Sequence, residues 1–318
     1  MTNECRGVRP VLLRLLVATA LWNGIGCAQQ SGGAMPPPEY LQAGRRAMEW
    51  TRRFVELGNR PAGSVQLQRQ SEMIVKHLER LSCTVEVDRF VAATPLGEVP
   101  IRNIFARFDT RPSVPVTVIS GHYDTIADPA FVGANDGGSS AALLAVLAER
   151  LDRSGREGVW LALFDGEEAA VEWRDSDHTY GSRRLAQRWA ADGTADRIDA
   201  LINVDMIGDS DLDLLFEGNS DAALREQVWD IAAALGYAAS FPRNLGYVQD
   251  DHISFLAVGV PSLNLIDFNY GPWNSYWHTP QDSLDKLSAR SFATVLHVLE
   301  VFLEQGRAQQ GRHQAAER

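Results

Sequence analysis

Cysteine is scarce in this chain of 318 residues, which contains only Cys5, Cys27 and Cys83. Cys5 and Cys27 fall within or beside an N-terminal leader, so the body of the chain keeps Cys83 alone. A lone cysteine cannot form an internal bridge, and this excludes a fold held together by disulfides. The simplest interpretation of Cys83 is a small, buried apolar residue.

Positive charge is also in short supply. Lys and Arg number 30 against 41 Asp and Glu, which gives a formal net charge of −11. A face that binds nucleic acid needs clustered Lys and Arg, so this balance argues against a nucleic-acid partner. The hydrophobic fraction of 45% and the charged fraction of 22% are ordinary for a soluble globular enzyme.

Long apolar runs are missing as well. The nearest candidate lies in residues 1–26, where Arg6 and Arg9 precede a short apolar core at Leu15–Trp22. The core is too short for a membrane span, and Arg14 stands directly before it. This arrangement is typical of an export signal peptide.

The end of this leader leaves its processing open. Gly24-Ile25-Gly26-Cys27 resembles the small-residue box before the lipid-modified cysteine of bacterial lipoproteins, so Cys27 is a candidate lipid anchor. Ordinary cleaved secretion and an uncleaved anchor are the alternatives. We therefore expect an exported protein that is periplasmic, anchored to a membrane as a lipoprotein, or secreted. Residues 27–38, rich in Gly, Ser and Pro, predict a flexible tether.

Beyond the tether, strand and helix patterns alternate. Strands are predicted at Thr84–Phe90, Ile101–Phe108, Val114–Ser120, Val159–Phe164, Ala200–Ile207 and Ser262–Ile266, and helices at 39–57, 65–81, 139–153, 180–191, 221–236 and 283–305. Such alternation predicts an α/β fold, a three-layer α/β/α sandwich around a mostly parallel, mixed central sheet. We expect one catalytic domain over residues 39–306 and a polar tail over 307–318.

Acidic and histidine side chains follow the predicted strands. Zn²⁺ takes nitrogen and oxygen ligands, and a catalytic site uses three protein ligands and an open position. Asp136, Glu168 and His278 suit that trio, and the adjacent Glu167 suits a general base. Taken singly, each has an ordinary explanation as a turn residue, a solvated helix start or a core histidine. Their co-occurrence at successive strand ends favours a metal site.

Several short motifs carry a family resemblance. His122-Tyr123-Asp124, Gly133-Ala134-Asn135-Asp136, Phe164-Asp165-Gly166-Glu167-Glu168-Ala169, Asp205-Met206-Ile207-Gly208 and Trp277-His278-Thr279 resemble the M28 zinc-peptidase superfamily. Within it, Trp173, Tyr180-Gly181-Ser182-Arg183, the stretch 248–256 and Gly259-Val260-Pro261 resemble the animal-type glutaminyl cyclases. The resemblance covers roughly residues 40 to 305 and implies a zinc-peptidase-like fold.

The resemblance implies the roles of the site residues. One zinc would be held by Asp136, Glu168 and His278; Glu167 would act as acid and base, and Asp250 would hydrogen-bond to it. Residues Trp173, Gln249, Trp273 and Trp277 would line the substrate pocket, and His122 and Asp205 would lie beside the zinc ligands or hold a second metal.

The implied reaction converts the N-terminal Gln of peptides or proteins to pyroglutamate and releases ammonia, and the protein is expected to be a monomer. Two residues depart from the cyclase pattern. Gly137 stands where Ser usually follows the metal-binding Asp, and Asn264 stands where a His is usual.

Two other functions remain open at this point. A secreted di-zinc aminopeptidase of the M28 type would use His122, Asp136 and Asp205 for one metal and Glu168 and His278 for the other. A peptidase-fold domain without catalysis, serving as a binding module, is the remote alternative. Asp250 and Asp251 also have an ordinary explanation, as an N-cap pair for a short helix at 252–258.

Overall fold

The computed structural model describes residues 33–109 and 115–316, with side chains as far as residue 306. The predicted leader at 1–26, the candidate anchor Cys27 and Val114 lie outside the described residues. From Gly33 onward the chain forms one compact unit.

A six-stranded sheet forms the centre of this unit. Its strands are β1 (Thr84–Thr94), β2 (Gly97–Phe108), β3 (Val116–His122), β4 (Val159–Phe164), β5 (Ile198–Asp205) and β8 (Ser262–Ile266), in the order β1-β2-β4-β3-β5-β8. Strands β4, β3, β5 and β8 are parallel to one another. Strands β1 and β2 form a hairpin, and β2 pairs with β4 in antiparallel fashion. The sheet is therefore mixed and mostly parallel, as predicted. A separate pair joins β6 (Phe216–Glu217) to β7 (Leu245–Gly246).

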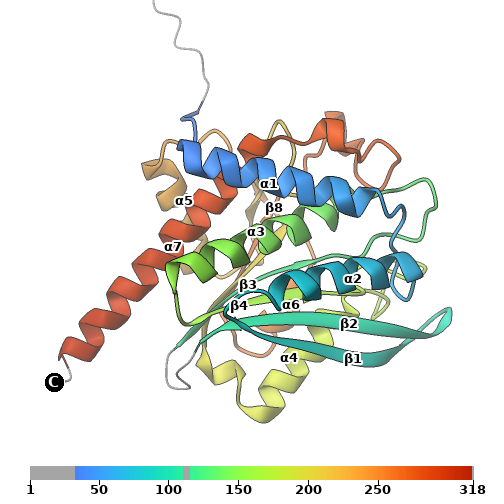
Figure 1. The fold of residues 1–318 in the computed structure, drawn as a ribbon, viewed down its shortest axis with the longest axis horizontal. Helices are drawn as coiled ribbons and strands as arrows, with labels where there is room; N and C mark the ends of the chain where they lie inside the picture. The colour runs from blue at the N-terminus through green and yellow to red at the C-terminus, as the bar shows by residue number, and fades with distance from the viewer. Residues whose placement is uncertain (1–32, 110–114, 317–318) are drawn as a thin grey trace, which may run out of the picture. The chain divides into compact units, whose positions relative to one another are not determined.

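Helices cover both faces of the sheet (Figure 1). They are α1 (Pro38–Val55), α2 (Val65–Leu78), α3 (Gly138–Ser154), α4 (Tyr180–Asp192), α5 (Ala222–Ala234), α6 (Asp251–Leu256) and α7 (Ala289–Ala316). One apolar core contains side chains of α1, α2, α3, α5 and α7, and a second contains those of α4 and α6. This confirms the predicted three-layer α/β/α architecture.

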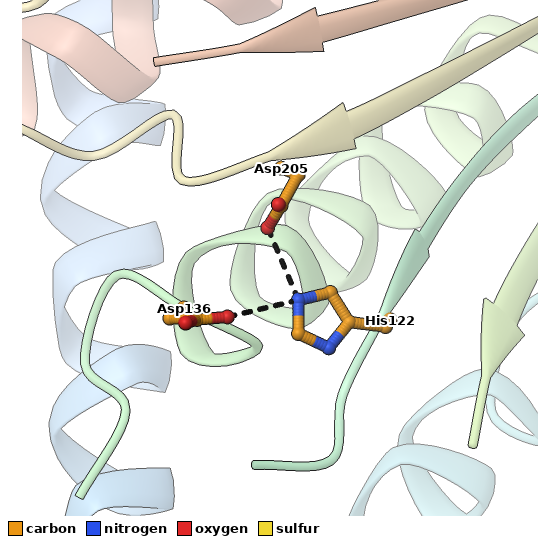
Figure 2. A group of neighbouring side chains, drawn as sticks. All are labelled: His122, Asp136 and Asp205. Carbon is orange, nitrogen blue, oxygen red and sulfur yellow. Dashed lines mark hydrogen bonds and ion pairs between the residues drawn. The ribbon is translucent and has the colours of Figure 1, made fainter. Parts of the chain in front are cut away.

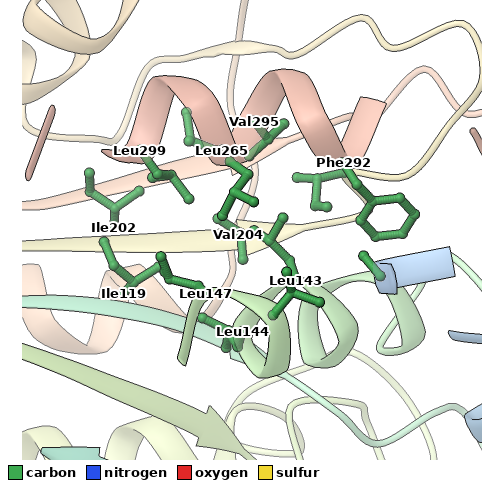
Figure 3. Packing of buried hydrophobic residues seen from close by; sticks show 14 of the residues in the cluster. Ile119, Leu143, Leu144, Leu147, Ile202, Val204, Leu265, Phe292, Val295 and Leu299 are labelled. Atoms are coloured by element: carbon green, nitrogen blue, oxygen red, sulfur yellow. The ribbon is translucent and has the colours of Figure 1, made fainter. Parts of the chain in front are cut away.

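Helix α3 is the centre of the larger core. Figure 3 shows its residues Leu143, Leu144 and Leu147 in one cluster with Val204 of β5 and Phe292 of α7. An α-helix that is apolar around most of its circumference must be covered on several sides. Burial of one leucine side chain contributes about 1.5–3 kcal/mol to folding stability. The buried leucines of α3 therefore stabilise its packing against the strands whose ends carry the candidate site.

Several boundaries differ from the predictions. Strand β1 continues to Thr94 rather than ending at Phe90, and β2 begins at Gly97 rather than at Ile101. Strand β5 ends at Asp205, two residues early, because Met206 takes a left-handed backbone with φ of 47°. The predicted helix at 283–305 begins only at Ala289, after Ser288 accepts a hydrogen bond from the backbone N–H of Ser291. It then continues to Ala316, into the predicted tail, where Ala, Gln and Arg are strong helix formers. No described helix is long and apolar enough to span a membrane.

Candidate metal centre and active-site cavity

The parallel strands deliver the candidate site residues to one edge of the sheet. His122 is the last residue of β3, Asp205 is the last residue of β5, and Glu167 and Glu168 follow β4 after a turn. In open α/β sheets, the carboxyl ends of parallel strands are where ligands bind. The order β4-β3-β5 places these ends side by side.

Two groups of side chains at this edge have the spacing of metal ligands, and they share Asp136. In the first, Nε2 of His278 lies 3.3 Å from Oδ2 of Asp136 and 3.2 Å from Oε1 of Glu168. Both of these oxygens are buried and have no hydrogen-bond partner. The side chain of His278 is 29% exposed, so this group reaches solvent. We call it the open triad.

The second group is enclosed. Figure 2 shows the imidazole of His122 between Asp136 and Asp205. Its Nε2 lies 3.2 Å from Oδ1 of Asp136 and 3.1 Å from Oδ1 of Asp205. The side chain of His122 is 1% exposed. We call His122, Asp136 and Asp205 the closed triad.

The open triad fits zinc. A nitrogen and two carboxylate oxygens are ligands that Zn²⁺ prefers, and three protein ligands leave a fourth position for substrate. Burial, with the neighbouring charge of Asp136, raises the pKa of Glu168 to about 7. A bound cation would offset the repulsion between the carboxylates of Asp136 and Glu168. It would also give Oδ2 of Asp136 and Oε1 of Glu168 a ligand to coordinate. The donor set therefore matches the metal that the resemblance implies.

Glu167 is placed for proton transfer. It is buried, and its backbone N–H donates to Asp124, as does that of Glu168. Burial raises the pKa of the Glu167 carboxyl well above its ordinary value; the charge of His122 opposes this rise and that of Glu168 adds to it. A carboxylate with raised proton affinity is a suitable general base near neutral pH.

Asp250 does not take the predicted position toward Glu167. Its Oδ1 accepts from Asn203 Nδ2 at 3.1 Å and from the backbone N–H of Asp251, and its Oδ2 accepts from Asn264 Nδ2 at 2.7 Å. No hydrogen bond joins it to Glu167 among the described residues. Asn264, which stands where the cyclase pattern usually has His, thus gives Asp250 a neutral amide donor. Asp250 also caps the N-terminus of α6. The N-cap interpretation is confirmed for Asp250 and is wrong for Asp251, because the helix begins at Asp251 and not at residue 252.

The departure at Gly137 has a steric reason. Its φ is +77°, a conformation that L side chains rarely adopt. A Cβ added there would lie 2.1 Å from the backbone oxygen of Asp124. The serine usual at this position therefore does not fit this backbone.

A cavity of about 680 Å³ opens in front of these residues. Of the residues predicted for the site, its lining includes Asp136, Glu167, Glu168, Trp173, Asp205, Gln249, Asp250, Trp277 and His278. His122 lies behind this lining. Phe268, which the sequence did not single out, joins the wall with its ring 5.0 Å from that of Trp277.

Trp273 is the one predicted pocket residue that lies away from the cavity. Its side chain is 97% exposed and is absent from the lining. The turn Pro272–Asn274 gives Trp273 a left-handed backbone with φ of 54°, and this turn directs the ring into solvent. Trp173 is 38% exposed and stacks on His178, with ring centroids 4.2 Å apart.

Asp282 is a supporting residue that sequence reasoning missed. Its carboxylate accepts from the backbone N–H groups of Asn135 and Asp136 at 2.7 and 3.1 Å and from the hydroxyl of Tyr270 at 2.8 Å. It holds the turn that presents Asp136, although it lies 146 residues away. Asp124 plays the same part for Glu167 and Glu168, and its place in His122-Tyr123-Asp124 was the only signal.

Fold and site together define an α/β protein of the zinc-peptidase type with a metal-ligand set at the carboxyl edge of its sheet. The model of peptidase family M28 matches residues 103–303. A glutaminyl-peptide cyclotransferase of Drosophila melanogaster is 31% identical over 260 residues, covering 73% of this chain and 72% of that protein. The chain belongs to peptidase family M28 and, within it, to the glutaminyl-peptide cyclotransferase family.

Solved structures agree with this placement. The crystal structure of a glutaminyl cyclase from an Acidobacteriales bacterium is 34% identical, with a TM-score of 0.78, covering 87% of this chain and 96% of that one. A Zn-dependent exopeptidase from Parabacteroides distasonis shares the fold at 22% identity, with a TM-score of 0.71 over 82% of this chain and 97% of that one. Both the family and the fold class predicted from the sequence are confirmed.

Proposed function

We propose that this protein is a zinc-dependent glutaminyl-peptide cyclotransferase. It converts the N-terminal Gln of peptides or proteins to pyroglutamate and releases ammonia. The observation that carries the proposal is the open triad with unpaired oxygens, facing an apolar cavity beside a buried Glu167. The family membership and the cyclase relatives support the same reaction.

In this proposal Asp136, Glu168 and His278 hold one zinc ion. When bound, zinc polarises the γ-carboxamide oxygen of the substrate and stabilises the negative charge that develops there. The three side chains that would hold the ion come from three different loops. Asp282 and Asp124 hold two of those loops by accepting backbone hydrogen bonds.

Glu167 moves the proton. The substrate's α-amine attacks its own γ-carbonyl carbon, so a C–N bond forms in the ring and the bond to the amide nitrogen breaks. Glu167 takes a proton from the attacking amine and delivers it to the departing nitrogen, which leaves as ammonia. The proton count balances within the substrate, and no water is consumed.

The cavity walls orient the substrate. The reaction is intramolecular, so its main requirement is to hold one rotamer of a flexible glutaminyl side chain. Trp277, Phe268 and Trp173 provide apolar surface for that purpose, and Gln249 provides a polar edge. The same walls limit access of water, which would otherwise hydrolyse the carboxamide to Glu.

Asp250 organises this wall from behind. Ser120, Asn203 and Asn264 occupy adjacent positions on β3, β5 and β8. Ser120 Oγ donates to Asn203 Oδ1 at 2.9 Å, and both asparagines donate to Asp250. This row of hydrogen bonds across three strands holds the carboxyl group of Asp250 in place and orients the loop that carries Gln249.

The remaining features complete the proposal. The protein acts after export, as a monomer, and Cys27 provides a lipid anchor to the membrane or the chain is released. One zinc is bound, because Nε2 of His122 already pairs with the carboxylates of Asp136 and Asp205 in the closed triad. The aminopeptidase alternative would require a second ion there.

One assay tests the function. The protein is incubated with an N-terminal glutaminyl dipeptide and, separately, with a leucyl chromogenic amide, and its zinc is counted in the same sample. Release of ammonia from the first, no cleavage of the second and about one zinc per chain support the cyclase. Cleavage of the second substrate with two zinc ions per chain would make the protein an aminopeptidase. Zinc without either reaction would favour the binding module.

A further inference from the structure

A second cavity, of about 360 Å³, lies between α1 and α2 and shares no lining residue with the active-site cavity. Four cationic side chains line it: Arg46 and Arg53 from α1, Lys76 from α2, and Arg80 from the turn that follows α2. In a chain with a net charge of −11, four cations around one hollow require an explanation. Unlike the active-site cavity, it exposes more polar than apolar surface.

The acidic residue at the floor of this cavity is already neutralised. The carboxylate of Glu149, on α3, lies 2.5 Å from Nη2 of Arg46 and 3.4 Å from Nε2 of His77. The side chain of Glu149 is 8% exposed. Glu49 also lines the cavity, and its carboxylate lies 3.9 Å from Arg52, which is not part of the lining. Neither acid of the lining forms an ion pair with Arg53, Lys76 or Arg80 among the described residues.

Arg53, Lys76 and Arg80 have no carboxylate within 4.0 Å in the described part of the chain. The guanidinium of Arg53 lies over the ring of Trp50, 4.3 Å from its centroid, and the Trp50 ring in turn contacts His77. This contact holds one cation in place at the cavity wall. Like charges that converge from two helices repel one another, and an anion between them would remove that repulsion.

We propose that this cavity binds a phosphate-bearing group. A phosphate has several acceptor oxygens for the three uncompensated cations, and guanidinium groups match its geometry with paired donors. The volume falls within the range of about 300–1,000 Å³ typical of small-molecule sites. The group is either the phosphate of a free small molecule or the headgroup of an anionic lipid.

The lipid source is sterically accessible. Helix α1 begins at Pro38, and the candidate anchor Cys27 precedes it by a short segment. Gly33 and Ala34 are hydrogen-bonded to Arg290 and Gly236, so only the segment from Cys27 to Gly33 could extend, and it spans at most about 20 Å. A bilayer that holds Cys27 would thus lie within about 20 Å of Gly33, which precedes the first helix.

The test uses the full chain and two probes. Binding of inorganic phosphate is measured by calorimetry, and binding of phosphatidylglycerol vesicles is measured by co-sedimentation, with phosphatidylcholine vesicles for comparison. The cavity variant is Arg53→Gln with Lys76→Gln. The matched control is Arg45→Gln with Arg69→Gln, which removes the same charge from the same two helices at exposed positions outside the lining.

The expected result is that at least one probe binds and that the cavity variant binds it at least tenfold more weakly, while the control variant binds as the parent does. Loss for phosphate identifies a free phosphate ligand, and loss confined to phosphatidylglycerol vesicles identifies a lipid headgroup. Equal loss of binding in the cavity and control variants would mean that overall charge, and not the cavity, determines binding. That result would overturn the proposal. Failure of the parent to bind either probe would overturn it as well.

Two measurements keep this test independent of other effects. All variants retain residues 1–32, so any membrane affinity of the leader is common to them. Melting temperature and ammonia release should match the parent in both variants, because none of the four substituted residues lines the active-site cavity. Failure of the cyclase assay would leave the phosphate result unaffected.

Discussion

The open and closed triads share Asp136 but differ in how their polar atoms are satisfied. In the closed triad, Nε2 of His122 bridges two carboxylates, and its side chain is almost fully enclosed. In the open triad, the inward oxygens of Asp136 and Glu168 lack hydrogen-bond partners, and His278 reaches the cavity. Buried polar groups are nearly always paired, so an unpaired set marks the place of a missing partner.

This comparison explains how one fold can serve two reactions. A peptidase that activates water gains from two ions, whereas an intramolecular cyclisation needs only one to polarise the carboxamide. Here Nε2 of His122 already contacts the two carboxylates of the closed triad, and the residues behind it continue as a hydrogen-bonded row toward Asp250. The proposal of one zinc therefore depends on the enclosure of the closed triad and not on the types of its ligands.

The largest effect should come from removing His278, and removal of His122 is the matched comparison. His278→Ala should lose nearly all zinc and lower the rate of ammonia release on the order of a thousandfold or more, since the metal contributes several kcal/mol to the transition state. His122→Ala should retain about one zinc per chain. Zinc is counted by elemental analysis in samples whose folded fraction is checked by melting. Equal zinc loss in both variants would contradict the distinction between the triads.

Next in size is Glu167→Gln, which preserves the shape of the side chain and removes its proton affinity. We expect a loss of kcat of about 10²–10⁴-fold, the usual contribution of a general acid–base group. Zinc content should be unchanged, because Glu167 belongs to neither triad. Steady-state kinetics and elemental analysis of the same sample provide the measurement. Undiminished turnover would remove Glu167 from its role.

A smaller effect should follow from Asn264→Leu, which breaks the row behind the closed triad. Oδ2 of Asp250 would lose its 2.7 Å partner, and an unpaired buried acceptor costs about 1–3 kcal/mol. We expect lower stability to denaturant. We also expect kcat to fall roughly tenfold, because a loss of about 1.4 kcal/mol in transition-state stabilisation lowers a rate tenfold. Asn264→His restores a donor and should recover much of both. If Asn264→His behaves like Asn264→Leu, a donor at this position is not what matters.

The strand ends and ligand types could be predicted because they depend on local patterns. Buried parallel strands are continuous apolar runs, and each is followed by the polar residue that the sheet edge exposes. The partners of those residues could not be predicted. Asp282 accepts a hydrogen bond from the backbone N–H of Asp136, 146 residues earlier in the chain, and no sequence periodicity connects the two positions. Asp250 likewise pairs with Asn203 and Asn264 only because β5 and β8 are neighbours.

The smallest expected effect concerns the two tryptophans that precede His278. Sequence proximity treats Trp273 and Trp277 alike, but the turn at Pro272 exposes 97% of Trp273 while Trp277 lines the cavity and stacks on His278 with centroids 4.0 Å apart. Trp277→Ala should raise KM for a glutaminyl dipeptide about tenfold through lost burial of aromatic surface. Trp273→Ala should change it less than about twofold, as exposed substitutions usually do. Steady-state kinetics of both variants test this difference. A comparable rise in KM for Trp273→Ala would mean that the loop carrying Trp273 folds over the substrate during turnover and closes the open side of the site.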